Sequence, residues 1–97
     1  PAEFPGGTTA LLQFIRDNLK YPESALWDSI QGKCVVKLLI SDKGKVQKVQ
    51  VARGIPNCPD CDKEAIRIMY LMPRWKPGRV NGQDVDSYYR IPVTFRL

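Results

Sequence analysis

The residues with the most distinctive chemical potential are two cysteines separated by two positions, in the segment Cys58-Pro59-Asp60-Cys61. A C-x-x-C pair at the start of a helix can carry a reactive thiolate and exchange disulfides. In an oxidising compartment, such a pair can instead form a local disulfide that clips the loop. The pair lacks the preceding βαβ pattern of a thioredoxin-like site and has no second pair for zinc, so we favour the disulfide and keep a thiol-redox module as an alternative hypothesis.

The remaining polar residues do not predict a catalytic or metal site. The 97 residues contain no histidine, which argues against most catalytic triads and the common zinc sites. Asp60, Asp62 and Glu64 fall at the predicted start of a helix, where capping and the helix dipole explain them, with Asp60 as the expected N-cap. Cys34 lies on an apolar strand face and is expected to be a buried, inert thiol. We therefore expect no enzymatic activity, no cofactor and no bound metal.

The last ten residues, Tyr88 to Leu97, read as a strand whose apolar residues alternate with polar ones. Pro92 lies in the middle of this strand, and because proline has no N–H to donate, its position is typical of an edge strand or a bulge. An edge strand exposes unpaired backbone groups. We interpret this strand as a docking edge that is open from about Tyr89 onward.

Three helices are predicted, at residues 10–19, 23–29 and 60–72. Thr8 or Thr9 is expected to cap the first helix, and Leu12 belongs to its predicted buried face. In the second helix, Ala25 and Leu26 are expected to turn inward, with Trp27 as a further candidate. These helices should each pack one face on a sheet.

Strands are predicted at residues 34–40 and 46–53 and at the C-terminus, and the first of these is apolar on both faces, as expected of a central strand. Val46 is out of phase with Val49, which fits a bulge or a strand end. Asn81-Gly82 predicts a short extra hairpin before the last strand. The fold class is α+β: a two-layer sandwich in which two helices back a three-stranded antiparallel sheet of order 2-1-3. The element order is α, short α, β, β, α, β, and residues 1–97 form one domain.

The net charge of +5 comes from Lys and Arg residues spread along the sequence. Without a basic run or a basic helix, this balance indicates a solvated surface rather than nucleic-acid binding. The sequence has no signal peptide and no apolar run of membrane-spanning length. Its start at Pro1 suggests a domain excised from a longer parent.

Several motifs, taken in order, resemble the C-terminal domain of TonB energy transducers. The similarity extends over essentially the whole chain, and each motif alone is weak while the ordered set is specific. The Cys58–Cys61 loop departs from the family pattern, and Lys20 stands where some members carry Gln. The motifs are Phe4-Pro5-Gly6-Gly7, Tyr21-Pro22, Gly32-Lys33-Cys34-Val35-Val36, Asp42-Lys43-Gly44-Lys45-Val46, Trp75-Lys76-Pro77-Gly78 and Pro92-Val93-Thr94-Phe95.

The resemblance implies a periplasmic domain of an inner-membrane-anchored protein, present as a monomer or a weak homodimer. It implies binding of the TonB box of an outer-membrane transporter by strand addition, with ExbB/ExbD-type motor proteins acting on the absent N-terminal part. The alternative is a sensor or interaction module of another envelope signalling protein. The partner-binding residues implied by the resemblance are Lys20, Tyr21, Pro22, Tyr88, Tyr89, Arg90, Ile91, Pro92, Val93 and Thr94.

Overall fold

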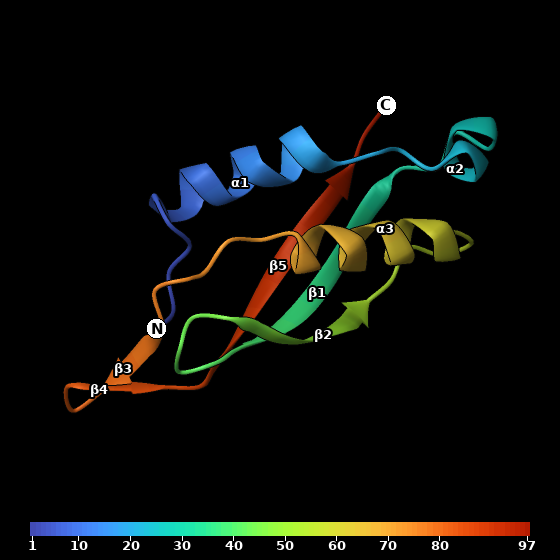
Figure 1. Ribbon diagram of the computed structural model, residues 1–97. Helices are drawn as coiled ribbons and strands as arrows, with labels where there is room; N and C mark the ends of the chain where they lie inside the picture. The colour runs from blue at the N-terminus through green and yellow to red at the C-terminus, as the bar shows by residue number, and fades with distance from the viewer.

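A computed structural model describes residues 1–97 and contains a three-stranded antiparallel sheet in the order β2-β1-β5 (Figure 1). Its strands are β1 (Gly32–Ile40), β2 (Val46–Arg53) and β5 (Ser87–Phe95). The predicted sheet order is confirmed, with the apolar strand in the centre and the C-terminal strand at an edge.

The central position of β1 follows from its side chains. Cys34, Val36, Leu38 and Ile40 are each 0% exposed and form one face. Val36 lies opposite Val51 of β2 and Ile91 of β5, so all three strands contribute to the same layer of the core. Apolar residues on both neighbours therefore fix the register of β1, because a shift by one residue would expose the whole row.

A register shift near the β1–β2 hairpin explains the phase of the two valines in β2. The pairing changes between Leu39↔Lys48 and Ile40↔Val46, so β2 has one extra residue there. This bulge lets Val46 and Val49, three positions apart, both pack against the core. Of the two expected alternatives, a bulge or a strand end, the structure shows a bulge, at the point where β2 begins.

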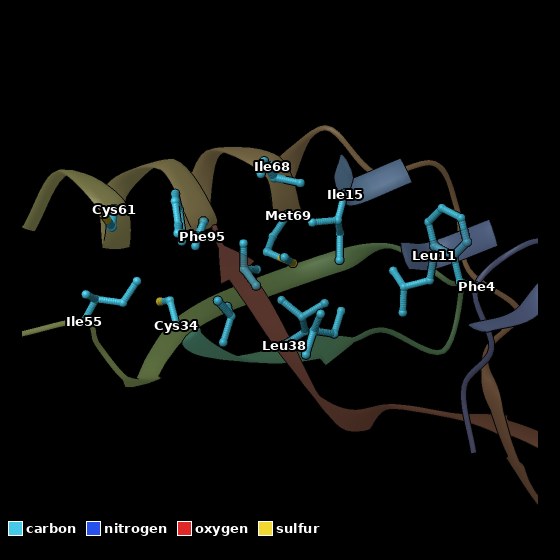
Figure 2. Packing of buried hydrophobic residues seen from close by; sticks show 14 of the residues in the cluster. Phe4, Leu11, Ile15, Cys34, Leu38, Ile55, Cys61, Ile68, Met69 and Phe95 are labelled. Carbon is cyan, nitrogen blue, oxygen red and sulfur yellow. The ribbon is translucent and has the colours of Figure 1, made fainter. Parts of the chain in front are cut away.

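Helices α1 (Gly7–Asn18) and α3 (Pro59–Tyr70) cover one face of the sheet, and the short α2 (Glu23–Trp27) lies at one end (Figure 1). Ile68 and Met69 of α3 and Ile15 of α1 point toward the sheet, and Phe95 of β5 points toward the helices (Figure 2). The hydrophobic effect therefore acts mainly between this single helical layer and one sheet face. None of the helices is long and apolar enough to cross a membrane.

The helix starts differ from the predictions. Gly6, at φ 86°, is the N-cap of α1 and no side chain caps the helix, so the expected cap by Thr8 or Thr9 is wrong. The N–H of Gly7 instead donates to the carbonyl of Phe4 at 2.7 Å and closes the turn that leads into the helix. The left-handed backbone of Gly6 makes this tight turn possible.

The cap of α3 also differs, because Cys58 and not Asp60 is the N-cap. Its sulfur accepts a hydrogen bond from the N–H of Cys61 at 3.1 Å. Asp60 instead accepts a hydrogen bond from the hydroxyl of Ser24 in α2 at 2.7 Å. The helix ends at Tyr70, with Leu71 as its C-cap, whereas the predicted end was residue 72.

Three apolar side chains predicted to be buried are exposed instead: Leu12 by 45%, Leu26 by 47% and Trp27 by 85%. In the five-residue α2, only Ala25 reaches the core, because so short a helix has room for one inward position.

The predicted extra hairpin is confirmed as β3 (Gly78–Val80) and β4 (Gln83–Val85), joined at Asn81-Gly82. Both turn residues have positive φ, as this hairpin type requires.

Candidate functional site: the open edge of β5 and its groove

The strand β5 pairs with β1 along its whole length and has no strand on its other side. The pairing runs from Gly32↔Phe95 to Ile40↔Ser87, and Pro92 lies opposite Val35. One long edge of the sheet therefore carries unpaired backbone groups.

The direction of these backbone groups follows from the hairpin that joins β1 to β2. There, the N–H of Ser41 donates to the carbonyl of Lys45 at 2.9 Å, so the backbone of Ser41 faces β2. Backbone groups alternate in direction along a strand, so those of Val35 also face β2 and those of Val36 face β5. Pro92, opposite Val35, directs its backbone away from β1. Its missing N–H costs the β1–β5 ladder no hydrogen bond and leaves a gap on the open edge.

The predicted partner-binding residues of β5 divide into two sets. The backbone groups of Tyr88, Arg90, Pro92 and Thr94 face the open edge, and their side chains are exposed. Tyr89, Ile91 and Val93 belong to the other set, with backbone groups directed at β1; Ile91 and Val93 are 1% and 0% exposed. The side chains of Ile91 and Val93 therefore lie in the core and cannot reach a partner, whereas the half-buried Tyr89 packs against the core from its margin.

A groove of about 480 Å³ lies beside the open edge. The helix α1 forms one wall and the exposed residues of β5 form the other. Apolar side chains line much of it, and two guanidinium groups, one on each wall, give it a positive charge. The lining residues are Leu12, Ile15, Arg16, Leu19, Pro92, Thr94 and Arg96.

Sequence reasoning missed the α1 wall of this groove. It assigned Leu12 to the core, whereas the structure buries Leu11 and Ile15 and leaves Leu12 45% exposed. Leu12, Arg16 and Leu19 repeat at spacings of four and three, which places them on one face of the helix. This second periodic face of the helix was the sequence signal that could have indicated the groove wall.

The predicted loop Lys20-Tyr21-Pro22 lies beyond the end of α1, near the C-terminal end of β5. The rings of Tyr21 and Phe95 pack in a T-shaped arrangement, with 5.6 Å between centroids, and the hydroxyl of Tyr21 donates to the carbonyl of Ile30. The structure thus places this loop near Phe95, whereas Tyr88 lies near the opposite end of β5. The loop and the groove adjoin the same half of the edge.

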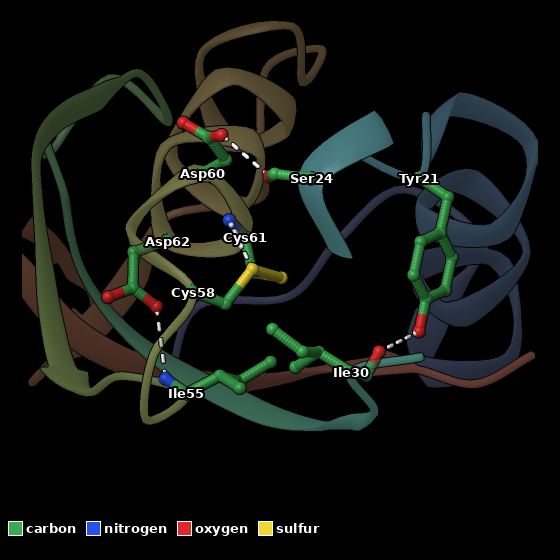
Figure 3. The surroundings of a disulfide bond; sticks show 8 residues. All are labelled: Tyr21, Ser24, Ile30, Ile55, Cys58, Asp60, Cys61 and Asp62. Atoms are coloured by element: carbon green, nitrogen blue, oxygen red, sulfur yellow. Dashed lines mark hydrogen bonds between the residues drawn. A yellow bond between two sulfur atoms is a disulfide. The ribbon is translucent and has the colours of Figure 1, made fainter. Parts of the chain in front are cut away.

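A disulfide joins Cys58 to Cys61 in the first turn of α3 (Figure 3). Beside it, the carboxylate of Asp62 accepts a hydrogen bond from the N–H of Ile55 at 3.1 Å. The thiol of Cys34 is buried, and burial, together with a hydrogen bond to Asp62, raises its pKa to about 12. A thiol in that state is a poor nucleophile.

Comparison with known proteins gives consistent results for the sequence and the fold. Residues 17–97 match the sequence model of a family described as the Gram-negative bacterial TonB protein C-terminal. Two curated relatives named Protein TonB, from two strains of Xanthomonas campestris pv. campestris, are each 32% identical over 80 residues, which cover 80% of this chain. The match covers 34% of each relative, so the chain spans about a third of their length.

Two NMR solution structures of the Helicobacter pylori TonB C-terminal domain have the same fold. The first has a TM-score of 0.64 at 18% identity and covers 90% of this chain and 89% of its own. The second has a TM-score of 0.62 at 22% identity and covers 89% of this chain and 77% of its own.

Proposed function

This chain belongs to the family of TonB C-terminal domains, and from that premise we propose that it is the periplasmic peptide-binding domain of an inner-membrane-anchored energy transducer. Its partner is the TonB box, an extended segment of an outer-membrane transporter, which pairs with β5 by strand addition. The observation that carries this proposal is the unpaired edge of β5, with the backbone groups of Tyr88, Arg90 and Thr94 facing outward.

Strand addition suits a coupling that must form, bear load and release. A box of about five residues, with a net gain of ~0.5–1.5 kcal/mol per hydrogen bond, gains roughly 3–7 kcal/mol before ordering costs. Such a gain corresponds to micromolar or weaker binding. Because main-chain groups make the ladder, the edge tolerates varied box sequences, and one domain can serve several transporters.

The groove adds side-chain selectivity to this backbone pairing. Side chains alternate between the two faces of an added strand, so every second side chain of the box would face Leu12, Leu19 and Pro92 in the groove. An apolar side chain there would bury surface that is now in contact with water. The affinity therefore rests on the edge and the preference among boxes rests on the groove.

Force from the membrane-anchored part would enter at the N-terminus. ExbB/ExbD-type motors, acting on that absent part, would supply it from the proton motive force. Glu3 exchanges two backbone hydrogen bonds with Lys76, at 2.9 and 2.7 Å. The next residue, Phe4, is 6% exposed, and its ring packs in a T-shaped arrangement with that of Trp75, with 5.5 Å between the ring centroids. A pull on Pro1 would therefore reach the core within four residues.

The test is a titration of the domain with a synthetic box peptide from a partner transporter, followed by backbone amide chemical shifts. We expect the largest shifts at Arg90 and Thr94, whose N–H groups face the edge, with smaller shifts at Leu12 and Arg16 across the groove. A control peptide carries proline at alternate positions and so lacks the N–H groups that pair with β5. Unchanged shifts along Tyr88–Thr94 would refute strand addition at this edge.

A further inference from the structure

The sheet face opposite the helices carries basic side chains and no acidic ones. The three strands of the sheet include none of the chain's 10 Asp and Glu residues. Their basic side chains alternate with residues of the buried face, or pair across from residues of the open face, and therefore point away from the core. These side chains, which we call the basic sheet face, are Lys33, Lys37, Lys48, Arg53 and Arg90.

The charges on the basic sheet face are not compensated within the fold. Lys37 lies directly opposite Arg90 in the β1–β5 pairing, and like charges in such a pair are destabilising. The two ion pairs of the structure are Arg67–Glu64 and Arg79–Asp84, and neither involves this face. A fold that keeps such a repulsive arrangement is suited to an external anionic partner.

Apolar and aromatic groups lie among these charges. Val35 and Leu39 of β1 are half-buried on the same face, and Tyr88 is 61% exposed. The ammonium group of Lys37 lies 4.3 Å from the centroid of the Tyr88 ring. Tyrosine and lysine with apolar neighbours are the side chains that occupy the boundary between lipid headgroups and acyl chains.

We propose that the basic sheet face docks on the surface of an anionic phospholipid bilayer. All three strands contribute cations to one open face, and such a broad basic surface is complementary to the extended layer of anionic headgroups on a bilayer. An acidic protein would be recognised by guanidinium forks in defined positions, whereas lysine ammonium groups make up most of this set. A second copy of the chain is disfavoured because it would bring two positive faces together. The docking does not depend on strand addition, because the open edge of β5 lies at the border of this face.

The proposal is tested by co-sedimentation of the domain with lipid vesicles. One set contains phosphatidylglycerol and phosphatidylcholine in equal parts, and the other contains phosphatidylcholine alone. We expect binding to the anionic vesicles only, with a loss of binding as the salt concentration rises, because salt screens exposed charges. Equal binding to both sets would overturn the proposal, as would binding to soluble poly-glutamate without binding to anionic vesicles.

A double variant, Lys37→Gln/Lys48→Gln, removes two charges from the basic sheet face and leaves β5 unaltered. Each cation near an anionic membrane contributes a factor of about five, so the vesicle affinity should fall roughly 10- to 30-fold. The matched control, Lys63→Gln/Lys76→Gln, removes the same net charge outside the sheet and should change the affinity less than about threefold. Equal losses in the two variants would refute a specific face.

Thermal unfolding of both double variants checks that the fold is intact. If Lys37→Gln/Lys48→Gln does not fold, the single variant Lys48→Gln replaces it, and its vesicle affinity should fall about fivefold. Box-peptide titration of the Lys37→Gln/Lys48→Gln variant should give the wild-type affinity. Vesicle binding and strand addition can therefore each fail without the other.

Discussion

The backbone N–H of Lys20 donates to the carboxylate of Glu64 at 2.7 Å, across 44 positions of sequence. The same carboxylate accepts two hydrogen bonds from the guanidinium of Arg67, both at 2.7 Å, and Arg67 also reaches the carbonyl of Asn18 at 2.8 Å. Glu64 thus ties the loop after α1, and with it one end of the groove, to α3. Burial alone would raise the pKa of Glu64, but the hydrogen bonds from Arg67 and Lys20 outweigh it and hold the pKa below its ordinary value.

Replacing Glu64 should therefore lower the stability in a pH-dependent way. We expect Glu64→Gln to reduce the free energy of unfolding by about 1–3 kcal/mol at neutral pH, since the Arg67 guanidinium loses its charged partner. The wild-type carboxylate has a lower pKa in the folded state than in the unfolded state, so its stabilisation is full above the unfolded pKa of about 4.3 and is lost as the pH falls through the folded value. Urea unfolding of both proteins from neutral to acidic pH should show the gap closing.

The control for this experiment is Glu23→Gln, which alters an exposed carboxylate in α2. It should change the stability by less than about 0.5 kcal/mol at any pH. A gap between wild type and Glu64→Gln that stayed constant down to acidic pH would contradict the assignment of a lowered pKa.

A second prediction concerns Gly44 in the β1–β2 hairpin. Gly44 has φ +80°, and a Cβ there would lie 1.9 Å from the carbonyl oxygen of Trp75. The N–H of Trp75 donates to the carbonyl of Gly44 at 2.7 Å, so the two backbones are held in contact. Gly44→Ala should cost more than about 3 kcal/mol, because backbone strain and a backbone clash act together. Gly82→Ala, at φ +77° with open space around it, should cost only about 1 kcal/mol, and similar losses in urea unfolding would contradict the clash.

The sequence was sufficient to predict the sheet, its order and its open edge. Those features depend on short-range patterns: two apolar faces in β1, alternation in β5, and Pro92, which excludes a central position. The phase break at Val46 was also visible in the sequence, but it fitted a strand end as well as a bulge, and only the pairing of β2 with β1 distinguishes the two.

The groove and the anchoring of its loop could not be predicted in the same way. Glu64 was assigned to the helix dipole because its partner Lys20 is 44 positions away, and no local pattern specifies such a contact. Leu12 was assigned to the core because an amphipathic pattern gives the direction of an apolar face but not its width. Cys58 was not predicted as the cap of α3 because it was assigned to the disulfide, and the structure gives it both roles.

A third prediction separates the structural and redox interpretations of Cys58 and Cys61. Their disulfide closes a loop with a sequence separation of three, so reduction should lower the free energy of unfolding by only about 1–2 kcal/mol. Because Cys58, Cys61 and Cys34 are 2%, 0% and 0% exposed, all three thiols of the reduced native protein should react slowly with a thiol reagent and become fast-reacting only on unfolding. Cys58→Ala/Cys61→Ala should be insensitive to reductant and should bind the box peptide normally. Catalysis of thiol exchange by the wild type, lost in Cys58→Ser, would instead support a redox module.

The last prediction uses the gap that Pro92 leaves in the open edge. In Pro92→Ala, the new N–H would face outward between those of Arg90 and Thr94, because the backbone at this position is directed away from β1. One further hydrogen bond of ~0.5–1.5 kcal/mol should tighten binding of the box peptide by roughly 2- to 10-fold. The free energy of unfolding should fall by no more than about 1 kcal/mol, the loss expected when an unfolded chain regains the freedom that proline removes.

Pro56→Ala is the matched control for Pro92→Ala, because Pro56 is an exposed proline in the loop between β2 and α3. It should reproduce the change in stability without the change in affinity. The completed edge of Pro92→Ala should also pair more readily with a second copy of the domain, and sedimentation equilibrium would detect the dimer. If Pro92→Ala raised the free energy of unfolding and left peptide affinity unchanged, the new N–H would be bonded to β1. The outward-facing residues of β5 would then be Tyr89, Ile91 and Val93, and strand addition would have to use their backbone groups instead.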